Sequence, residues 1–317
     1  MMRPGFSFRE VNMDRSILSV VAALLGLMMS AFASAYQLQV SAGYEEVRPE
    51  RGSIAGDVNS ASIDMGVYFK PLDDEGRPWR LLPFLDRASL VSVQHEQTRF
   101  PDNSFSTTSK DTGVAAEIQV AQTPLRLGAG RTRVDTGSPF PDQADEYDAT
   151  SYMIGWYLFD NGLLSYSGVE VDLEVLGIDR GQSGWSLDYR HALAAGSRGW
   201  FEFTLGTRES EVRNVGTWPV MGTLEFERQV AGATYYPSQV FGIGLQLARH
   251  SQTFANDPDS FDEEDVRLAL SFDPVETFGL LVYYSDRSTE EIGGPGSFRT
   301  EVDLDTQTIG AQLDFRF

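Results

Sequence analysis

The sequence contains no cysteine, so neither disulfide bonds nor thiolate metal sites can hold this protein together. Basic residues are scarce: 25 Lys and Arg stand against 46 Asp and Glu, and the formal net charge is −21. A chain with this charge repels nucleic acid and anionic lipid surfaces. Glycine-rich phosphate loops, HExxH motifs and nucleotide-binding fingerprints are also absent from the sequence. We therefore expect no cofactor, no metal ion and no nucleic acid partner.

Long hydrophobic runs are missing too, with one exception near the N-terminus. Three arginines precede an apolar run over residues 17–32, and the small residues 33–35 follow it. This order is typical of a secretory signal peptide with an A-x-A cleavage site. A transmembrane anchor is the alternative, but a run of about 16 residues is short for a membrane span. We expect residues 1–35 to be a cleaved signal peptide, with Met13 as an alternative start of translation and Tyr36 as the first mature residue.

A second uncharged stretch covers residues 229–248. It contains Pro237 and three glycines, which suit a strand, a turn and a second strand better than a lipid-facing helix. We therefore expect no transmembrane helix in the mature chain. An exported, cysteine-free chain that is rich in alternating segments has two main options, a large soluble β-domain or a transmembrane β-barrel.

Fourteen segments have the alternation of apolar and polar residues that is typical of β-strands. They cover approximately residues 36–47, 60–72, 79–97, 110–121, 125–135, 147–159, 163–178, 184–194, 199–213, 221–235, 239–251, 264–272, 277–287 and 302–317. Short connections (73–78, 122–124, 160–162, 195–198, 237–238 and 273–276) take turns with longer polar ones (48–59, 98–109, 136–146, 179–183, 214–220, 252–263 and 288–301). Outer-membrane barrels show this alternation of tight periplasmic turns and longer extracellular loops.

Aromatic residues gather beside the short connections, where a membrane interface would lie. They are Phe69, Trp79, Phe159, Trp200, Phe201, Tyr235, Tyr236, Phe241, Phe272 and Phe278, with Tyr36 and Phe317 at the ends of the mature chain. A general preference of aromatic residues for strands explains their number but not their position. The pattern predicts one aromatic girdle at the end of the barrel that holds the turns.

The last nine residues form the most informative segment, because Ile309, Ala311, Leu313, Phe315 and Phe317 alternate with polar residues or glycine up to the C-terminus. This strand resembles the closing strand of bacterial outer-membrane β-barrels, whose C-terminal Phe is part of the signal that the barrel assembly machinery recognises. Together with the signal peptide and the connections, the resemblance to porin-like proteins covers residues 36–317. It implies an all-β fold, namely a single closed antiparallel transmembrane β-barrel of about 14 strands, in a range of about 12–16. It also implies a location in the Gram-negative outer membrane, among lipid and lipopolysaccharide, with an assembly signal at Leu313, Phe315 and Phe317.

Some barrels are enzymes, and the three histidines, His95, His191 and His250, are the residues to test for this. None of them lies two residues before a serine, as the outer-membrane phospholipase family requires. An omptin-like protease needs a His–Asp pair and an acidic pair near the outer rim, and His95 is the candidate for such a pair. The acidic stretch 256–265 lacks the spacing of an EF-hand and is expected to be a solvated loop. We expect no enzymatic activity.

If the apolar face of each strand contacts lipid, the opposite face lines the interior, where charged groups need water or partners. We expect the third long loop, 136–146, to fold inward as in many porins, with its acids near Arg131 and Arg133. The residues expected to line a pore are Asp64, Lys70, Glu117, Arg131, Arg133, Asp142, Asp145, Glu146, Glu170, Asp172, Glu174, Asp188, Arg190, Glu202, Asp314 and Arg316. The alternative is a closed interior cross-linked by ion pairs of Arg126, Arg190, Arg228, Arg267 and Arg316. A barrel of about fourteen strands is wider than the eight-stranded type that side chains fill, which favours a pore.

These patterns predict an outer-membrane porin for passive diffusion of small hydrophilic solutes or ions, with a preference for cations because acidic residues outnumber basic ones in the expected lumen. A non-conducting structural or receptor barrel and a hydrolase at the outer rim are the alternatives. The sequence leaves the solute open. It also leaves a homotrimer open, because a trimer interface and a lipid-facing surface are both apolar.

Overall fold

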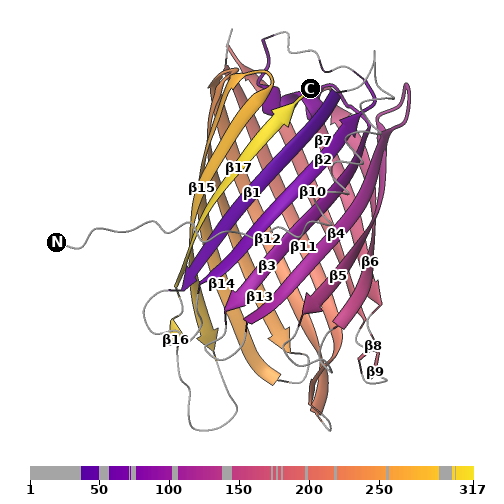
Figure 1. Cartoon of the computed structure of the whole chain (residues 1–317), viewed down its shortest axis with the longest axis vertical. Helices are drawn as coiled ribbons and strands as arrows, with labels where there is room; N and C mark the ends of the chain where they lie inside the picture. Colours follow the sequence, from indigo (N-terminus) through magenta and orange to yellow (C-terminus); the bar gives the residue numbers. More distant parts are fainter. Residues whose placement is uncertain are drawn as a thin grey trace, which may run out of the picture. The chain divides into compact units, whose positions relative to one another are not determined.

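The computed structural model describes residues 37–49, 57–70, 72, 76–101, 106–137, 145–172, 174–175, 178–179, 181–196, 199–217, 220–254, 257–292, 302–303 and 305–317. Residues 37–317 form one compact unit. Within the described ranges, fourteen long strands pair in antiparallel order and close into a barrel, because β1 pairs with β2 on one side and with β17 on the other (Figure 1). The predicted all-β barrel of about fourteen strands is confirmed. The predicted signal peptide, residues 1–35, lies outside the described residues.

The strands of the barrel are β1 (Gln37–Pro49), β2 (Val58–Tyr68), β3 (Leu90–Pro101), β4 (Ser106–Gln119), β5 (Leu125–Gly137), β6 (Asp145–Phe159), β7 (Gly162–Asp172), β10 (Gln182–Ala195), β11 (Gly199–Thr217), β12 (Val220–Ser238), β13 (Phe241–Phe254), β14 (Asp257–Val275), β15 (Phe278–Ile292) and β17 (Thr306–Arg316). Shorter elements are the hairpin of β8 (Glu174–Val175) and β9 (Ile178–Asp179), and β16 (Val302–Asp303), which pairs with β15. A 3-10 turn, η1 (Trp79–Leu81), and a one-turn helix, α2 (Leu82–Leu85), lie between β2 and β3. Among the described residues, no helix is long and apolar enough to span a membrane.

The two ends of the barrel differ. β1 begins and β17 ends at the same end, which also holds the short connections at residues 120–124, 160–161, 239–240 and 276–277, and we call it the turn end. We call the opposite end the loop end. This arrangement follows from an even number of antiparallel strands.

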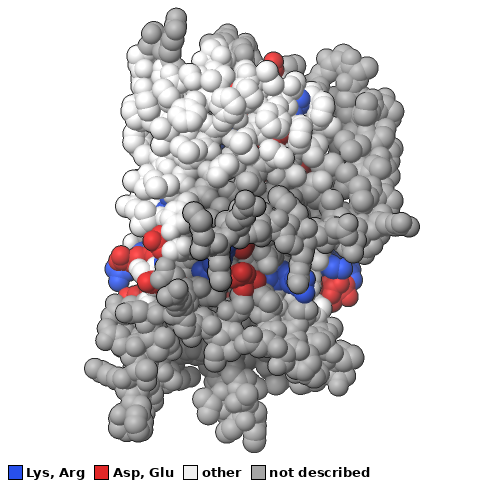
Figure 2. Space-filling view, turned by 60° about the vertical axis from the view of Figure 1, so that its left-hand side comes forward, with Lys and Arg blue, Asp and Glu red and all other residues white. Residues whose placement is uncertain are grey.

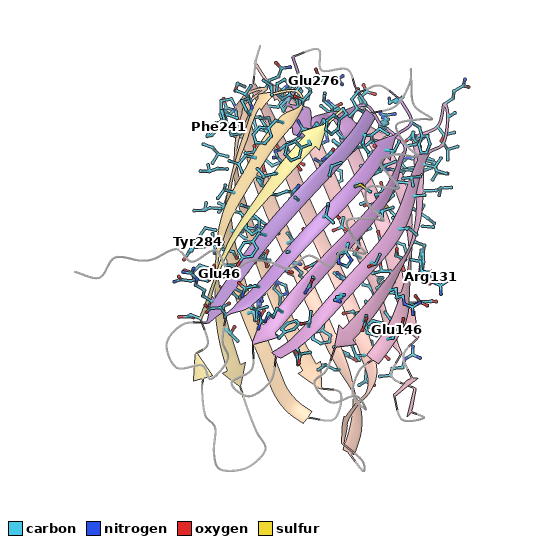
Figure 3. The ribbon with its side chains drawn as sticks, in the orientation of Figure 1. Glu46, Arg131, Glu146, Phe241, Glu276 and Tyr284 are labelled. Carbon is cyan, nitrogen blue, oxygen red and sulfur yellow. The ribbon has the colours of Figure 1, made fainter. Side chains whose placement is uncertain are left out.

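The outside of the barrel carries an apolar band next to the turn end. Large hydrophobic side chains that are at least one third exposed lie on the outward positions of successive strands, including Ile118, Leu127, Ile154, Leu187, Leu205, Ile243, Leu245, Leu247, Val266, Leu268, Leu270, Ile309 and Leu313. Figure 2 shows this uncharged area and, below it, a row of Lys, Arg, Asp and Glu. The band lies between the level of Phe241 near the turn end and that of Tyr284 (Figure 3). An outward apolar band bounded by polar residues is what a bilayer requires of a barrel.

Aromatic residues mark both edges of the band. At the turn end, exposed rings include Phe69, Phe159, Phe201, Tyr235, Phe272 and Phe317, all of which the sequence places in the predicted girdle. A second girdle, which the sequence analysis did not predict, lies toward the loop end, where the ring of Tyr166 lies 6.4 Å from those of Tyr152 and Trp185. A side chain at Gly168 would collide with the Tyr152 ring, so this glycine gives the ring its place. Two girdles match the two interfaces of a membrane.

The connection between β2 and β3 differs most from the prediction. Residues 79–89 were predicted to begin a strand, but they form η1, α2 and a turn, and β3 begins at Leu90. Pro83 in the first turn of α2 suits a helix and lacks the N–H that a strand ladder needs. The turn ends at Arg87, whose φ of 51° reverses the chain toward β3. We call residues 76–89 the plug, because they fold into the barrel, as the contacts below show.

Candidate functional site: the barrel interior

The plug is attached through one arginine to two strands of the wall beyond β1, namely β14 and β17. The Arg80 guanidinium forms ion pairs with Asp273 on β14, at 3.2 Å, and with Asp314 on β17, at 2.8 Å. The Asp314 side chain is fully buried and also accepts hydrogen bonds from Ser41 Oγ, at 2.7 Å, and Gln312 Nε2, at 2.8 Å. Buried charges are stable only when they are paired and hydrogen-bonded in this way. Arg80 therefore joins the plug to the strands that close the barrel.

Apolar contacts attach the plug to a second part of the wall. Leu81 and Phe84 are almost completely buried, and they pack in one cluster with Tyr157 on β6, Ala192 on β10 and Tyr236 on β12. The Phe84 and Tyr157 rings stack with their centroids 6.1 Å apart. Since these three strands lie across the ring from β1 and β2, the plug reaches through the interior at the turn end.

The packing corrects part of the predicted girdle. Trp200 and Tyr236 were expected to face the membrane, but Tyr236 is buried in the cluster and Trp200 packs against it from inside. Trp79 belongs to η1 in the plug. Trp200 and Tyr236 occupy inward positions of β11 and β12, so their side chains contact the plug and not the lipid.

Two further arginines of the wall hold the partners of the plug in place. Arg126 donates to Glu117 Oε2, at 2.8 Å, and to the Tyr157 hydroxyl, at 3.2 Å, and Tyr157 in turn donates to the Phe84 carbonyl, at 3.4 Å. Arg190 Nε donates to Glu202 Oε1, at 2.5 Å, and its guanidinium lies 4.6 Å from the centre of the Phe84 ring. Glu202 Oε2 accepts a hydrogen bond from Tyr236, at 3.0 Å. Arg316 on β17 pairs with Asp273 at 3.2 Å. The turn end thus contains cross-links of the kind proposed for a closed interior, and these involve Arg126, Arg190 and Arg316.

The inward faces of the wall differ in their charged residues. The inward positions of β1–β4 carry five acidic side chains and, within the described residues, no Lys or Arg; the acids are Glu45, Asp64, Glu96, Asp111 and Glu117. The inward positions of β11–β15 carry both signs, namely the bases Arg208, Arg228, Arg267 and Arg287 and the acids Glu202, Glu263 and Asp265. Because β11 and β12 lie across the ring from β2 and β3, Arg208 and Arg228 face the acids of those two strands.

The predicted pore residues fall into four groups. Asp64, Glu117, Asp188, Arg190, Glu202, Asp314 and Arg316 occupy inward positions. Lys70 is exposed and lies two residues beyond the end of β2, at the turn end. Asp142 lies outside the described residues, as do the side chains of Asp145, Asp172 and Glu174.

Four predicted pore residues face outward, and their prediction was wrong. Arg131 pairs with Asp148 at 2.6 Å, and Arg133 pairs with Glu146, on the outer surface of β5 and β6. Arg131 and Glu146 project from the outside of the ribbon in Figure 3. Glu170 is exposed on the same outer surface, opposite Thr150 of β6. The strands continue beyond the apolar band at the loop end, so there the charged side chains face outside water and the apolar ones, such as Val171, face inward.

Sequence analysis missed three residues of the interior. Arg80 lies in a segment predicted as strand, and Asp273 was placed in a turn, so their pairing had no sequence signal. Arg208 could have been found, because it shares its strand face with Glu202, which was assigned to the interior. Alternation places both on one side of β11.

The structure does not assemble an omptin-like site around His95. The His95 side chain occupies an outward position of β3, where Nδ1 lies 2.8 Å from Thr112 Oγ1 on β4. Within the described part of the chain, no group of three or more His, Asp and Glu side chains could hold a metal ion. The histidine that the rim-hydrolase alternative requires therefore faces away from the acids of the lumen.

Comparison with solved structures identifies the architecture. Omp33, an outer membrane protein of Acinetobacter baumannii, matches with a TM-score of 0.50 and 15% sequence identity over 89% of this chain and 99% of that one. The fold is that of a bacterial outer-membrane β-barrel. A Pseudomonas aeruginosa FadL homologue matches with a TM-score of 0.53 and 11% identity over 90% of this chain and 91% of its own. The CymD monoaromatic hydrocarbon channel matches with a TM-score of 0.54 and 9% identity over 93% of this chain and 92% of its own. No protein-family model and no curated protein matches the sequence.

Proposed function

We propose that this outer-membrane barrel is a porin through which small hydrophilic solutes diffuse, with its turn end toward the periplasm and the plug narrowing that end. One observation carries the proposal: inward-facing polar side chains remain exposed, among them Gln94 and Glu96 on β3, Asp188 on β10 and Arg208 on β11. Charged groups inside a membrane need water or a partner, and exposed ones have room for water. A hydrated lumen of this kind suits polar solutes.

The proposal includes a preference for cations. Glu45, Asp64, Glu96 and Asp111 lie on the inward positions of β1–β4 without an ion pair within 4 Å among the described residues. Arg208 and Arg228 on the opposite wall also have no ion pair within 4 Å in the part of the chain that the structure describes, and Arg267 is stacked on Tyr283 with its guanidinium 3.5 Å from the ring centre. Unpaired acids along the path attract cations and repel anions.

Planar-bilayer recording tests this function directly. The mature protein is expected to give stepwise ion currents, and in a salt gradient the reversal potential is expected to favour cations. Removing lumen acids by the double change Asp64→Asn and Glu96→Gln should shift the reversal potential toward anions. Arg131→Gln is the matched control, because it removes a charge from the outer surface and should leave the reversal potential where it was. Persistent absence of current from folded protein would contradict the porin proposal.

A second candidate, a non-conducting structural or receptor barrel, is favoured by the plug. The plug fills part of the interior at the turn end and is held by buried ion pairs. A barrel that stays closed would carry no current in the parent and gain current only when the plug is removed. The two candidates therefore differ in the current of the unmodified protein.

The outer surface fits the partners that we propose for it. The apolar band with its two aromatic girdles suits outer-membrane lipid, and the charged row at the loop end, with pairs such as Arg131–Asp148, suits the level of lipopolysaccharide head groups. Leu313, Phe315 and Phe317 are exposed on the outward positions of β17, so an assembly machine could reach them from outside. Their role as an assembly signal is part of the proposal.

A further inference from the structure

Two arginines of the lumen wall oppose each other directly. In the ladder between β11 and β12, Arg208 is the partner of Arg228, and both side chains face inward. Like charges at directly opposed positions of an antiparallel ladder are destabilising. Asp265 attracts Arg228, whereas Arg287, Arg208 and Arg267 repel it. This part of the wall therefore places more bases than acids around Arg228.

The acids nearby are committed to other partners. Glu263 on β14 pairs with Arg287 at 3.4 Å, and Asp265 accepts a hydrogen bond from Ser285. Neither Arg208 nor Arg228 has an ion pair within 4 Å in the described part of the barrel. Asp265 thus offsets only part of the positive charge around the two opposed arginines.

Two buried nitrogens remain without a hydrogen-bond partner in the described part of this wall. Arg228 Nε and His250 Nε2 are shielded from solvent, and neither has a hydrogen-bond partner among the described residues. His250 is the ladder partner of Arg228 on the next strand, β13, so the two orphaned nitrogens are neighbours. An unsatisfied buried polar group is costly, about 1–3 kcal/mol for a neutral group and more for a charged one. An oxygen acceptor that is not part of this chain would satisfy both nitrogens, with His250 in the tautomer that carries its proton on Nε2.

A cavity gives that acceptor room. A space of about 440 Å³ lies against this part of the wall, and its lining includes Arg208, Ser210, Arg228, His250, Gln252 and Glu263. Guanidinium groups present several N–H donors in a planar fork that matches carboxylate and phosphate oxygens. Hydroxyl and amide side chains can complete the hydrogen bonds of such a group.

We propose that Arg208, Arg228 and His250 form a binding site for the oxyanion group, carboxylate or phosphate, of a small solute inside the barrel. The acids of β2 and β3 face the site from across the ring, so a solute that also carries a positive group can contact both walls at once. The site goes beyond the proposed porin function. The net charge of the lumen sets the preference among simple salt ions, whereas this cluster binds the oxyanion group of a particular solute.

Binding can be measured without any current. The full chain, folded in detergent micelles, is titrated with inorganic phosphate, and the ³¹P line width reports the bound fraction. We expect saturable broadening that acetate reverses if the site accepts carboxylates as well as phosphate. Arg228→Gln and, separately, Arg208→Gln should each weaken phosphate binding about tenfold or more, since each removes charge-assisted hydrogen bonds. Arg131→Gln, which removes an exposed arginine from the outer surface, should leave binding unchanged.

A second measurement separates binding from folding. In low-salt buffer without phosphate, Arg228→Gln should raise the unfolding temperature, because it removes the opposed like charges. Added phosphate should raise the unfolding temperature of the parent and of Arg131→Gln but not that of Arg228→Gln. Equal phosphate binding by the parent and Arg228→Gln would overturn the site. Phosphate binding by a folded barrel that carries no current would instead overturn the porin function and leave the site in place.

Discussion

Replacing Arg80 by alanine is expected to raise the single-channel conductance several-fold. Arg80 is the cation that joins the plug to Asp273 and Asp314, and both carboxylates are almost completely buried. Breaking a buried ion pair by removing one partner costs about 3–5 kcal/mol, which is comparable to the packing of a small segment such as the plug. The strands keep their ladders, so the plug rather than the barrel is expected to give way.

A thiol-labelling experiment reports the position of the plug independently of current. Because the natural chain has no cysteine, Phe84→Cys supplies the single thiol. Phe84 is 4% exposed, so this thiol should react slowly with a water-soluble maleimide in the otherwise natural protein and quickly once Arg80→Ala is added. Arg131→Ala is the control, since it removes an arginine from the outer rim and should change neither conductance nor labelling.

The plug would lose its assigned role under one combination of results. If Arg80→Ala exposes the Phe84→Cys thiol while the conductance stays at the parent value, the plug moves but does not limit the flow of ions. The narrowest part of the channel would then lie elsewhere. In gel electrophoresis, an unboiled sample of the variant that migrates like the boiled sample would show that the barrel itself had unfolded.

The second large effect is expected on the outer surface. Leu270 lies on an outward position of β14, between Phe272, the partner of Phe241, and Leu268, the partner of Tyr284, and is 51% exposed. An arginine at the midplane of a lipid-facing barrel surface costs about 2–4 kcal/mol. Leu270→Arg should therefore lower the free energy of unfolding by about that amount in urea titrations of the barrel in lipid vesicles.

The neighbouring residue on the same strand provides the matched control. Ala269 faces inward and lines a cavity of about 290 Å³, so an arginine there has room and does not contact lipid. Ala269→Arg should cost less than about 1 kcal/mol, as is usual for changes away from packed or lipid-facing positions. Equal losses from the two changes would contradict the assignment of inside and outside that the strand register gives.

The barrel was largely predictable because its signals are local. Alternation over residues 309–317 predicts a strand with one apolar face, and the regular order of short and long connections predicts an even number of antiparallel strands. These signals depend on neighbouring residues only. The structure bears them out in the closing pairs, where Ala42 is the partner of Leu313 and Tyr44 that of Ala311.

The interior was less predictable, because alternation alone does not say which face is wet. Inside the apolar band the polar face of a strand turns inward, as at Glu202, but beyond the band it turns outward, as at Glu170 and Arg131. Where the band ends is a property of the whole barrel and not of one strand. Pro83 indicates that residues 79–89 do not form a strand, and this could have been seen in the sequence. The partners of Arg80 could not, because they lie nearly two hundred residues away or more.

The partners of Arg80 also impose an order on how the molecule is built. Asp314 comes from the last strand and its hydrogen-bond donor Ser41 from the first, 273 positions apart in the chain. Until β1 and β17 have paired, Asp314 lacks its hydrogen bond from Ser41, and the acceptor for Arg80 is incomplete. We therefore expect the plug to dock through Arg80 only after the barrel has closed.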